Sequence, residues 1–132
     1  MRTAALILDM DGLMLDSEPL YKRAWQGAAK ELGYELSDAV YLTMVGRSTV
    51  DCERQLLEHF GGRFPLPEFH SRWSELWRLQ ANTGIATKPG LMELLSFAEQ
   101  HNLPVAVATS SDRDVWCSKI RMPACSRRVE RE

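Results

Sequence analysis

The sequence has 132 residues, of which 45% are hydrophobic and 26% are charged. This composition is typical of one ordinary globular domain and excludes a disordered or fibrous chain. The formal net charge of -2 gives no electrostatic reason to bind nucleic acid or an anionic membrane surface. We therefore expect a small molecule as the partner, and no nucleic acid, membrane or specific protein.

The first expected element is a strand at residues 4–9, "AALILD". The run is apolar up to Asp9, which is typical of a parallel-sheet strand that is covered on both faces. It is too short for a secretory signal, and the three cysteines contain no CxxC pair. We therefore expect a cytoplasmic protein with reduced thiols.

Helical patterns follow in the middle of the chain. The spacing predicts a helix over residues 19–32, with Ser17 as its N-cap and Gly33 as its stop, because every fourth residue from Leu20 to Leu32 is apolar. Capping residues and apolar faces predict further helices over residues 37–44, 48–62, 67–80 and 91–100. Residues 104–111, "PVAVATSS", then predict a second strand that begins at Pro104.

This order predicts an α/β fold, a partial doubly wound (Rossmann-like) parallel sheet with an inserted α-helical cap. Two parallel strands need one helical crossover, which residues 91–100 supply, so the earlier helices are surplus to the sheet. We expect residues 1–15 and 86–114 to form the core and residues 16–85 to form the cap. Residues 115–132 are then an atypical tail.

Polar residues stand where both strands end. Asp9 and Asp11 follow the first strand, and Thr109 follows the second, at the edge where open parallel sheets bind ligands. Two carboxylates one residue apart need a compensating charge, and Mg²⁺ with a substrate phosphate supplies it most simply. One aspartate can attack phosphorus while the other transfers protons. Gly12 permits a sharp turn, and the Thr109 hydroxyl can hold a transferring oxygen.

The stretch "LILDMDGLMLDSEP" at residues 6–19, with "VAVATSS" at residues 105–111, resembles the haloacid dehalogenase superfamily, and within it the β-phosphoglucomutase-like phosphatases that carry a helical cap. The resemblance implies Mg²⁺ as cofactor and a small phosphate ester, such as a sugar phosphate, as substrate. Asp9 is then the nucleophile and a metal ligand. Asp11 is the general acid and base, and its backbone carbonyl is a metal ligand. Thr109 and Ser110 bind phosphate.

The resemblance also places "VGRS", residues 45–48, in the cap facing the substrate, which makes Arg47 a candidate substrate contact. A solvated cap residue is the alternative for Arg47. Ser17 and Glu18 are either substrate contacts or only the cap of the following helix. Gly12 is a further candidate, because its backbone lies close to the phosphoryl group in this arrangement.

Later parts of the family pattern have no counterpart after residue 114. The family has a lysine and a further acidic pair on later strands, and Lys119 lacks the motif that would identify it as that lysine. We therefore expect a truncated or frameshifted chain that is inactive, a genuinely divergent C-terminus being the alternative, and we expect Leu6, Leu8, Val105 and Val107 to be incompletely covered.

Two alternatives to a phosphatase remain open. One is a phosphomutase, whose members usually carry a histidine where this chain has Tyr21. The other is a non-catalytic remnant. A DxD pair also holds a nucleotide-sugar metal in glycosyltransferases, but there the pair would not normally begin the chain or precede "DSEP".

Overall fold

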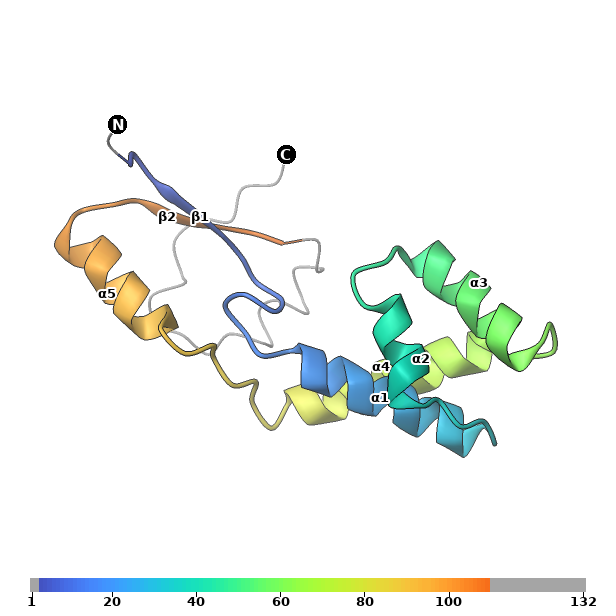
Figure 1. Ribbon diagram of the computed structural model, residues 1–132. Helices are drawn as coiled ribbons and strands as arrows, with labels where there is room; N and C mark the ends of the chain where they lie inside the picture. The colour runs from blue at the N-terminus through green and yellow to red at the C-terminus, as the bar shows by residue number, and fades with distance from the viewer. Residues whose placement is uncertain (1–2, 110–132) are drawn as a thin grey trace. The chain divides into compact units, whose positions relative to one another are not determined.

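The computed structural model describes residues 3–109 of the chain (Figure 1). Ser110, Lys119 and the tail expected at residues 115–132 lie outside the described residues. The chain divides into two compact units. Within the described part, one unit holds residues 3–18 and 81–109, and the other holds residues 19–80.

The first unit is built on a parallel pair of strands, β1 (Leu6–Asp9) and β2 (Val105–Ala108). Helix α5 (Leu91–Gln100) connects to β2 through a short turn, as Figure 1 shows. Leu6 pairs with Val105, and Asp9 pairs with Ala108. This arrangement confirms the predicted α/β class. Both strands are shorter than predicted, and Pro104 precedes β2, although its carbonyl accepts a hydrogen bond from the Leu6 N–H at 2.8 Å.

One face of the two strands is covered. Leu8 is only 8% exposed and belongs to a cluster with Met10, Met14, Leu15 and Leu91. The partly buried residues packed against this cluster are Leu6, Ile85, Leu95, Val105 and Val107. The β1 residues of this face therefore contact the same apolar cluster as α5 and the turn that follows β1.

The other face is open, and this corrects two expectations. Successive side chains on a strand alternate between faces, so Ile7 lies opposite Leu8 and is 73% exposed. Ala106 and Ala108 on β2 are exposed as well. In the described residues β1 is thus covered on one face, not both. Leu6, Val105 and Val107 are only partly buried, as expected, whereas Leu8 is buried and Ile7 is exposed.

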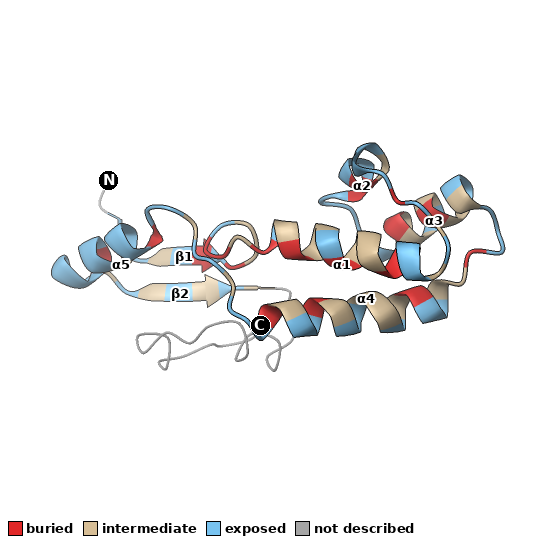
Figure 2. Cartoon of the chain, turned by 90° about the horizontal axis from the view of Figure 1, so that it is seen from below, coloured by how far each residue is buried: buried red, intermediate tan, exposed pale blue. Residues whose placement is uncertain are grey.

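The second unit is a group of four helices: α1 (Glu18–Glu31), α2 (Asp38–Met44), α3 (Thr49–Phe60) and α4 (Leu66–Ala81). Their inward faces share one core, whose buried members are Ala28, Ala29, Leu36, Tyr41, Met44, Cys52, Leu56, Phe64 and Phe69. Figure 2 shows α1 and α4 side by side, each with buried positions spaced along its length. Trp77 is 6% exposed, so it belongs to the protein interior.

Polar contacts between helices fix how the four helices pack. The Arg72 guanidinium of α4 pairs with the Glu31 carboxylate of α1 through two nitrogens and so holds the pKa of Glu31 below its ordinary value. Glu53 of α3 lies 2.9 Å from Nε2 of His70 on α4. The Nδ1 atom of the same ring accepts a hydrogen bond from Trp73 at 3.2 Å.

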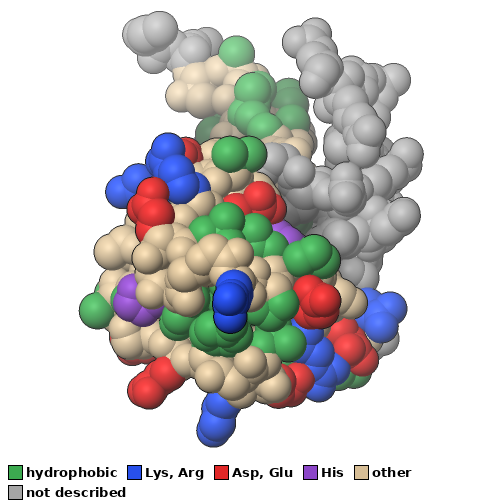
Figure 3. Space-filling view, turned by 90° about the vertical axis from the view of Figure 1, so that its right-hand side faces the viewer, with side chains coloured by type: hydrophobic (Ala, Val, Ile, Leu, Met, Phe, Trp, Pro, Cys, Tyr) green, Lys and Arg blue, Asp and Glu red, His purple; other side chains and the backbone are tan. Residues whose placement is uncertain are grey.

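The described surface carries a mixture of residue types. Figure 3 shows acidic, basic and hydrophobic side chains interspersed on one side of the molecule. Within residues 3–109, no helix is both long enough and apolar enough to cross a membrane.

Candidate functional site

The pairing register of the two strands brings the ends of β1 and β2 to the same edge. Asp9 is the last residue of β1 and lies opposite Ala108, the last residue of β2, so Thr109 begins the chain segment that leaves this edge. The Asp9 side chain is exposed, and its Oδ1 accepts a hydrogen bond from the Met10 N–H at 2.8 Å. One carboxylate oxygen is thus fixed by the backbone at the carboxyl end of the strand.

Asp11 and Gly12 lie in a tight turn directly after β1. The Leu15 N–H donates to the Met10 carbonyl at 3.0 Å, and the Gly12 N–H donates to the Leu15 carbonyl at 2.9 Å. Gly12 has φ of +78°, a conformation that side-chain-bearing residues rarely adopt, and a Cβ atom there would have no atom within 4 Å. The glycine is therefore required by the backbone conformation and not by crowding. The turn keeps Asp11, which is half-buried, two residues beyond the end of the sheet.

A second segment of the same unit holds this turn in place. The Lys88 N–H donates to the Met14 carbonyl at 2.9 Å, and the Asp16 N–H donates to the Ala86 carbonyl at 2.8 Å. The side chains add an ion pair, with Lys88 Nζ 2.8 Å from Asp16 Oδ1. Lys88 is not among the candidate site residues that the sequence motifs predict. Only its position just before Pro89, where the chain enters α5, marks it as part of a connection.

Ser17 does not cap α1, although the helix begins at Glu18 as that prediction requires. The Ser17 side chain is 0% exposed, and its Oγ has no hydrogen-bond partner among residues 3–109. A predicted cap would accept a bond from a backbone N–H of the first helical turn. Because Oγ is enclosed, a ligand would reach it only after the surrounding residues moved. Glu18 is exposed.

The carboxylates at this edge suit a hard divalent cation. Mg²⁺ in proteins is commonly held by one or two carboxylates, several waters and a substrate phosphate. Asp9 and Asp11 are such a pair, placed around one turn. Among residues 3–109 no group of three or more acidic, histidine or cysteine side chains forms a complete metal cage. The donors fit a magnesium ion that shares its ligands with substrate and water.

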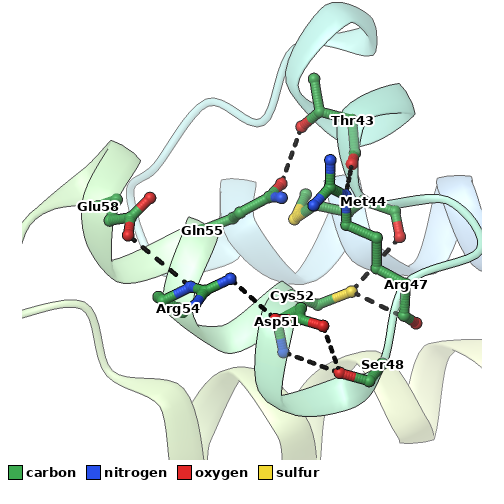
Figure 4. Close-up of polar contacts among 9 residues, drawn as sticks. All are labelled: Thr43, Met44, Arg47, Ser48, Asp51, Cys52, Arg54, Gln55 and Glu58. Carbon is green, nitrogen blue, oxygen red and sulfur yellow. Dashed lines mark hydrogen bonds and ion pairs between the residues drawn. The ribbon is translucent and has the colours of Figure 1, made fainter.

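Arg47 belongs to the second unit, in the loop between α2 and α3 (Figure 4). The loop is fixed by the backbone: the Arg47 N–H donates to the Met44 carbonyl at 3.1 Å, and Gly46 takes φ of +76°. Ser48 caps α3, since its Oγ accepts from the Asp51 N–H at 3.2 Å. Arg47 itself is exposed. Asp9, Asp11, Gly12 and Thr109 thus belong to one unit and Arg47 to the other.

The buried thiol of Cys52 in α3 contacts the loop between α2 and α3. The Cys52 Sγ donates to the Met44 carbonyl at 3.4 Å and lies 4.0 Å from the Arg47 carbonyl. Burial, with a smaller contribution from the charge of Asp51, raises the pKa of Cys52 above its ordinary value. The thiol is therefore a structural hydrogen-bond donor, which supports the expectation that it is an ordinary reduced thiol.

Residues 3–122 match the family model of the haloacid dehalogenase-like hydrolases. The chain is 26% identical over 117 residues to a phosphorylated carbohydrates phosphatase of Thermotoga maritima, covering 89% of this chain and 54% of that protein. It is 27% identical over 117 residues to hexitol phosphatase A of Escherichia coli, covering 87% of this chain and 52% of that protein. The chain therefore spans about half the length of these curated relatives.

The fold agrees with a solved structure of the same family. A HAD hydrolase of family IA, variant 3, from Entamoeba histolytica superposes with a TM-score of 0.69 at 22% identity, over 86% of this chain and 52% of that one. This likeness concerns the fold, and the family match spans all of the described residues. The chain belongs to the haloacid dehalogenase-like hydrolases.

Proposed function

We propose that the protein to which this chain corresponds is a phosphatase of small, sugar-phosphate-like esters, with Asp9 as nucleophile. The supporting observation is the parallel register, which ends β1 at Asp9 and β2 beside Thr109. The carboxyl edge of a parallel sheet is where such folds bind ligands. The family, and the named activities of the two phosphatases above, agree with this chemistry.

The reaction proceeds through two displacements at phosphorus. An Asp9 oxygen attacks the phosphorus atom, the bond to the leaving oxygen breaks, and an aspartyl phosphate forms. Asp11, as the carboxylic acid, gives its proton to the leaving alkoxide, so the alcohol departs neutral. Asp11, now a carboxylate, then takes a proton from water as the water attacks the aspartyl phosphate. Inorganic phosphate leaves and the Asp9 carboxylate is restored.

The other candidate residues bind and orient the ester. The Thr109 hydroxyl, with Ser110 beyond the described residues, donates to phosphoryl oxygens at the end of β2. Gly12 brings the backbone close to the same oxygens. The Asp9 carboxylate and the Asp11 carbonyl would hold Mg²⁺, and the bound cation would offset the negative charge that accumulates on the phosphoryl oxygens. Arg47 contacts the substrate from the helical unit, which acts as the cap, and Glu18 lies at the start of its first helix.

A test with no need for turnover uses beryllofluoride, a phosphoryl analogue that coordinates to a nucleophilic carboxylate. The full chain should give a protein-bound ¹⁹F signal in the presence of Mg²⁺. Asp9→Asn should abolish this signal, because an amide oxygen is a much poorer ligand. Glu93→Gln, at an exposed carboxylate in the first turn of α5, is the matched control and should keep it. A bound signal that persists in Asp9→Asn would refute the assignment of Asp9.

The companion measurement is hydrolysis of p-nitrophenyl phosphate with Mg²⁺. Any turnover should vanish in Asp9→Asn and fall by about two to four decades in Asp11→Asn, the usual contribution of general acid and base catalysis. An unchanged rate in Asp11→Asn would remove Asp11 from the mechanism.

A further inference from the structure

The side chains of Thr43, Gln55 and Arg47 lie together between α2 and α3 (Figure 4), and the hydrogen-bonding capacity of Thr43 determines which way the Gln55 amide is turned. The Thr43 hydroxyl has one hydrogen, and it donates this hydrogen to the Val40 carbonyl at 2.7 Å. Towards Gln55 the Thr43 oxygen must therefore accept, so the Gln55 amide nitrogen donates to it, at 2.9 Å. The Gln55 carbonyl oxygen then faces Arg47. It accepts a hydrogen bond from Nη1 of Arg47 at 3.2 Å, and it lies 3.2 Å from Nε, whose single hydrogen it shares with a second acceptor.

A backbone carbonyl completes this arrangement. Arg47 Nε also donates to the Thr43 carbonyl at 2.6 Å, at the end of α2. The guanidinium is thus fixed between the last turn of α2 and the second turn of α3. Its Nη2 makes no hydrogen bond to any of residues 3–109, which leaves donor groups for a ligand.

Arg54, on the same helix as Gln55, gives the contrast. Its Nη2 lies 2.8 Å from Asp51 Oδ1, and its Nε lies 3.9 Å from Glu58 Oε1. Arg54 thus forms ion pairs with two carboxylates, whose negative charges offset its positive charge. The partners of Arg47 within the described residues are uncharged oxygens. When only neutral acceptors orient a guanidinium, no neighbouring carboxylate offsets its positive charge. Such a guanidinium is suited to bind the paired oxygens of a phosphate or carboxylate group.

We propose that Gln55 is a positioning residue that orients the Arg47 guanidinium toward an oxyanion of the ligand. This inference rests on the proposed function, in which Arg47 is a substrate contact, and it names the group that Arg47 takes: a phosphate or carboxylate oxygen and not a sugar hydroxyl. A neutral amide at position 55 is required, because a carboxylate there would hold the guanidinium but cancel its charge.

The test uses the ¹⁵N-labelled full chain, the Nε–H signal of Arg47, and inorganic phosphate as the probe. The signal is identified by its loss in Arg47→Gln. Gln55→Leu should speed hydrogen exchange at Arg47 Nε by about 2- to 10-fold and weaken phosphate binding by a similar factor, as expected for one net hydrogen bond. Gln55→Glu should keep exchange slow and still weaken phosphate binding.

The two variants together separate positioning from a general structural role. A purely structural Gln55 would lower stability without moving the Arg47 signal, and that result would overturn the proposal. Arg54→Gln is the control and should leave exchange and phosphate binding unchanged. Phosphate that shifts the Arg54 signal as much as that of Arg47 would also refute it. Since Asp9 and beryllofluoride take no part, failure here is distinct from failure of the proposed function.

Discussion

The close approach of α1 and α4 at Gly27 allows a quantitative test of the helical unit. Gly27 lies inside α1, and a Cβ atom there would lie 3.1 Å from Cδ1 of Leu76 on α4. Replacing glycine by alanine inside a helix stabilises it by about 1 kcal/mol. The optimum distance between carbon atoms is about 3.5–4.0 Å, so Leu76 must move by a few tenths of an ångström. We therefore expect Gly27→Ala to gain only about 0.5 kcal/mol, the remainder being lost to this contact.

A double-mutant cycle isolates the contact. In a Leu76→Ala background the added methyl group meets no side chain at that position, so Gly27→Ala should gain the full amount of about 1 kcal/mol. Urea unfolding followed by far-UV circular dichroism measures all four proteins. In the single variant the gain corresponds to a rise in Tm of roughly 2–4 °C. Equal gains in both backgrounds would show that α1 and α4 do not meet at these residues.

Three further predictions concern the charges, the thiol and the open sheet face. Because the folded pKa of Glu31 is lowered by Arg72, the pair stabilises the fold above about pH 5, and this contribution is lost as the pH falls through the folded pKa. The difference in urea midpoint between the unmodified chain and Glu31→Gln should therefore be constant above pH 5 and shrink below about pH 4; a difference that grows on acidification would contradict this. Alkylation of Cys52, followed by peptide mapping, should be at least about tenfold slower in the folded chain than in urea, and equal rates would show that the thiol is not buried. Ile7→Thr should reduce self-association in sedimentation experiments while keeping the strand, whereas Leu8→Thr should unfold it.

The starts of α2 and α3 followed from local patterns because both helices begin at a capping serine. Ser37 and Ser48 both accept a hydrogen bond from the N–H three residues later, as a capping serine should. Ser17 has the same type and position but makes no such bond, since its side chain turns into the interior. A pattern along the chain indicates where a helix begins; it does not determine which way the serine side chain points.

The open face of the sheet is a second feature that the sequence pattern alone did not determine. A run such as "LILD" is apolar on both sides, and only tertiary packing decides which side is covered. The turn after β1 and helix α5 cover Leu8, so Ile7 stays exposed. The candidate nucleophile Asp9 shares the face of Ile7 by strand alternation, which agrees with its exposure.

The proposed chemistry and the proposed specificity depend on different kinds of structure. Asp9 and Thr109 are brought to one edge by backbone pairing, so a DxDG motif after one strand and a hydroxyl after the next are sufficient to predict them. Arg47 is instead oriented through Thr43 and Gln55, which lie four residues before it and eight after it, and neither belongs to a motif. Substitutions at Thr43 or Gln55 should therefore change which ligand binds while leaving the reaction at Asp9 unaltered. The residues that we propose to set specificity therefore lie outside the segment that carries the proposed catalytic residues.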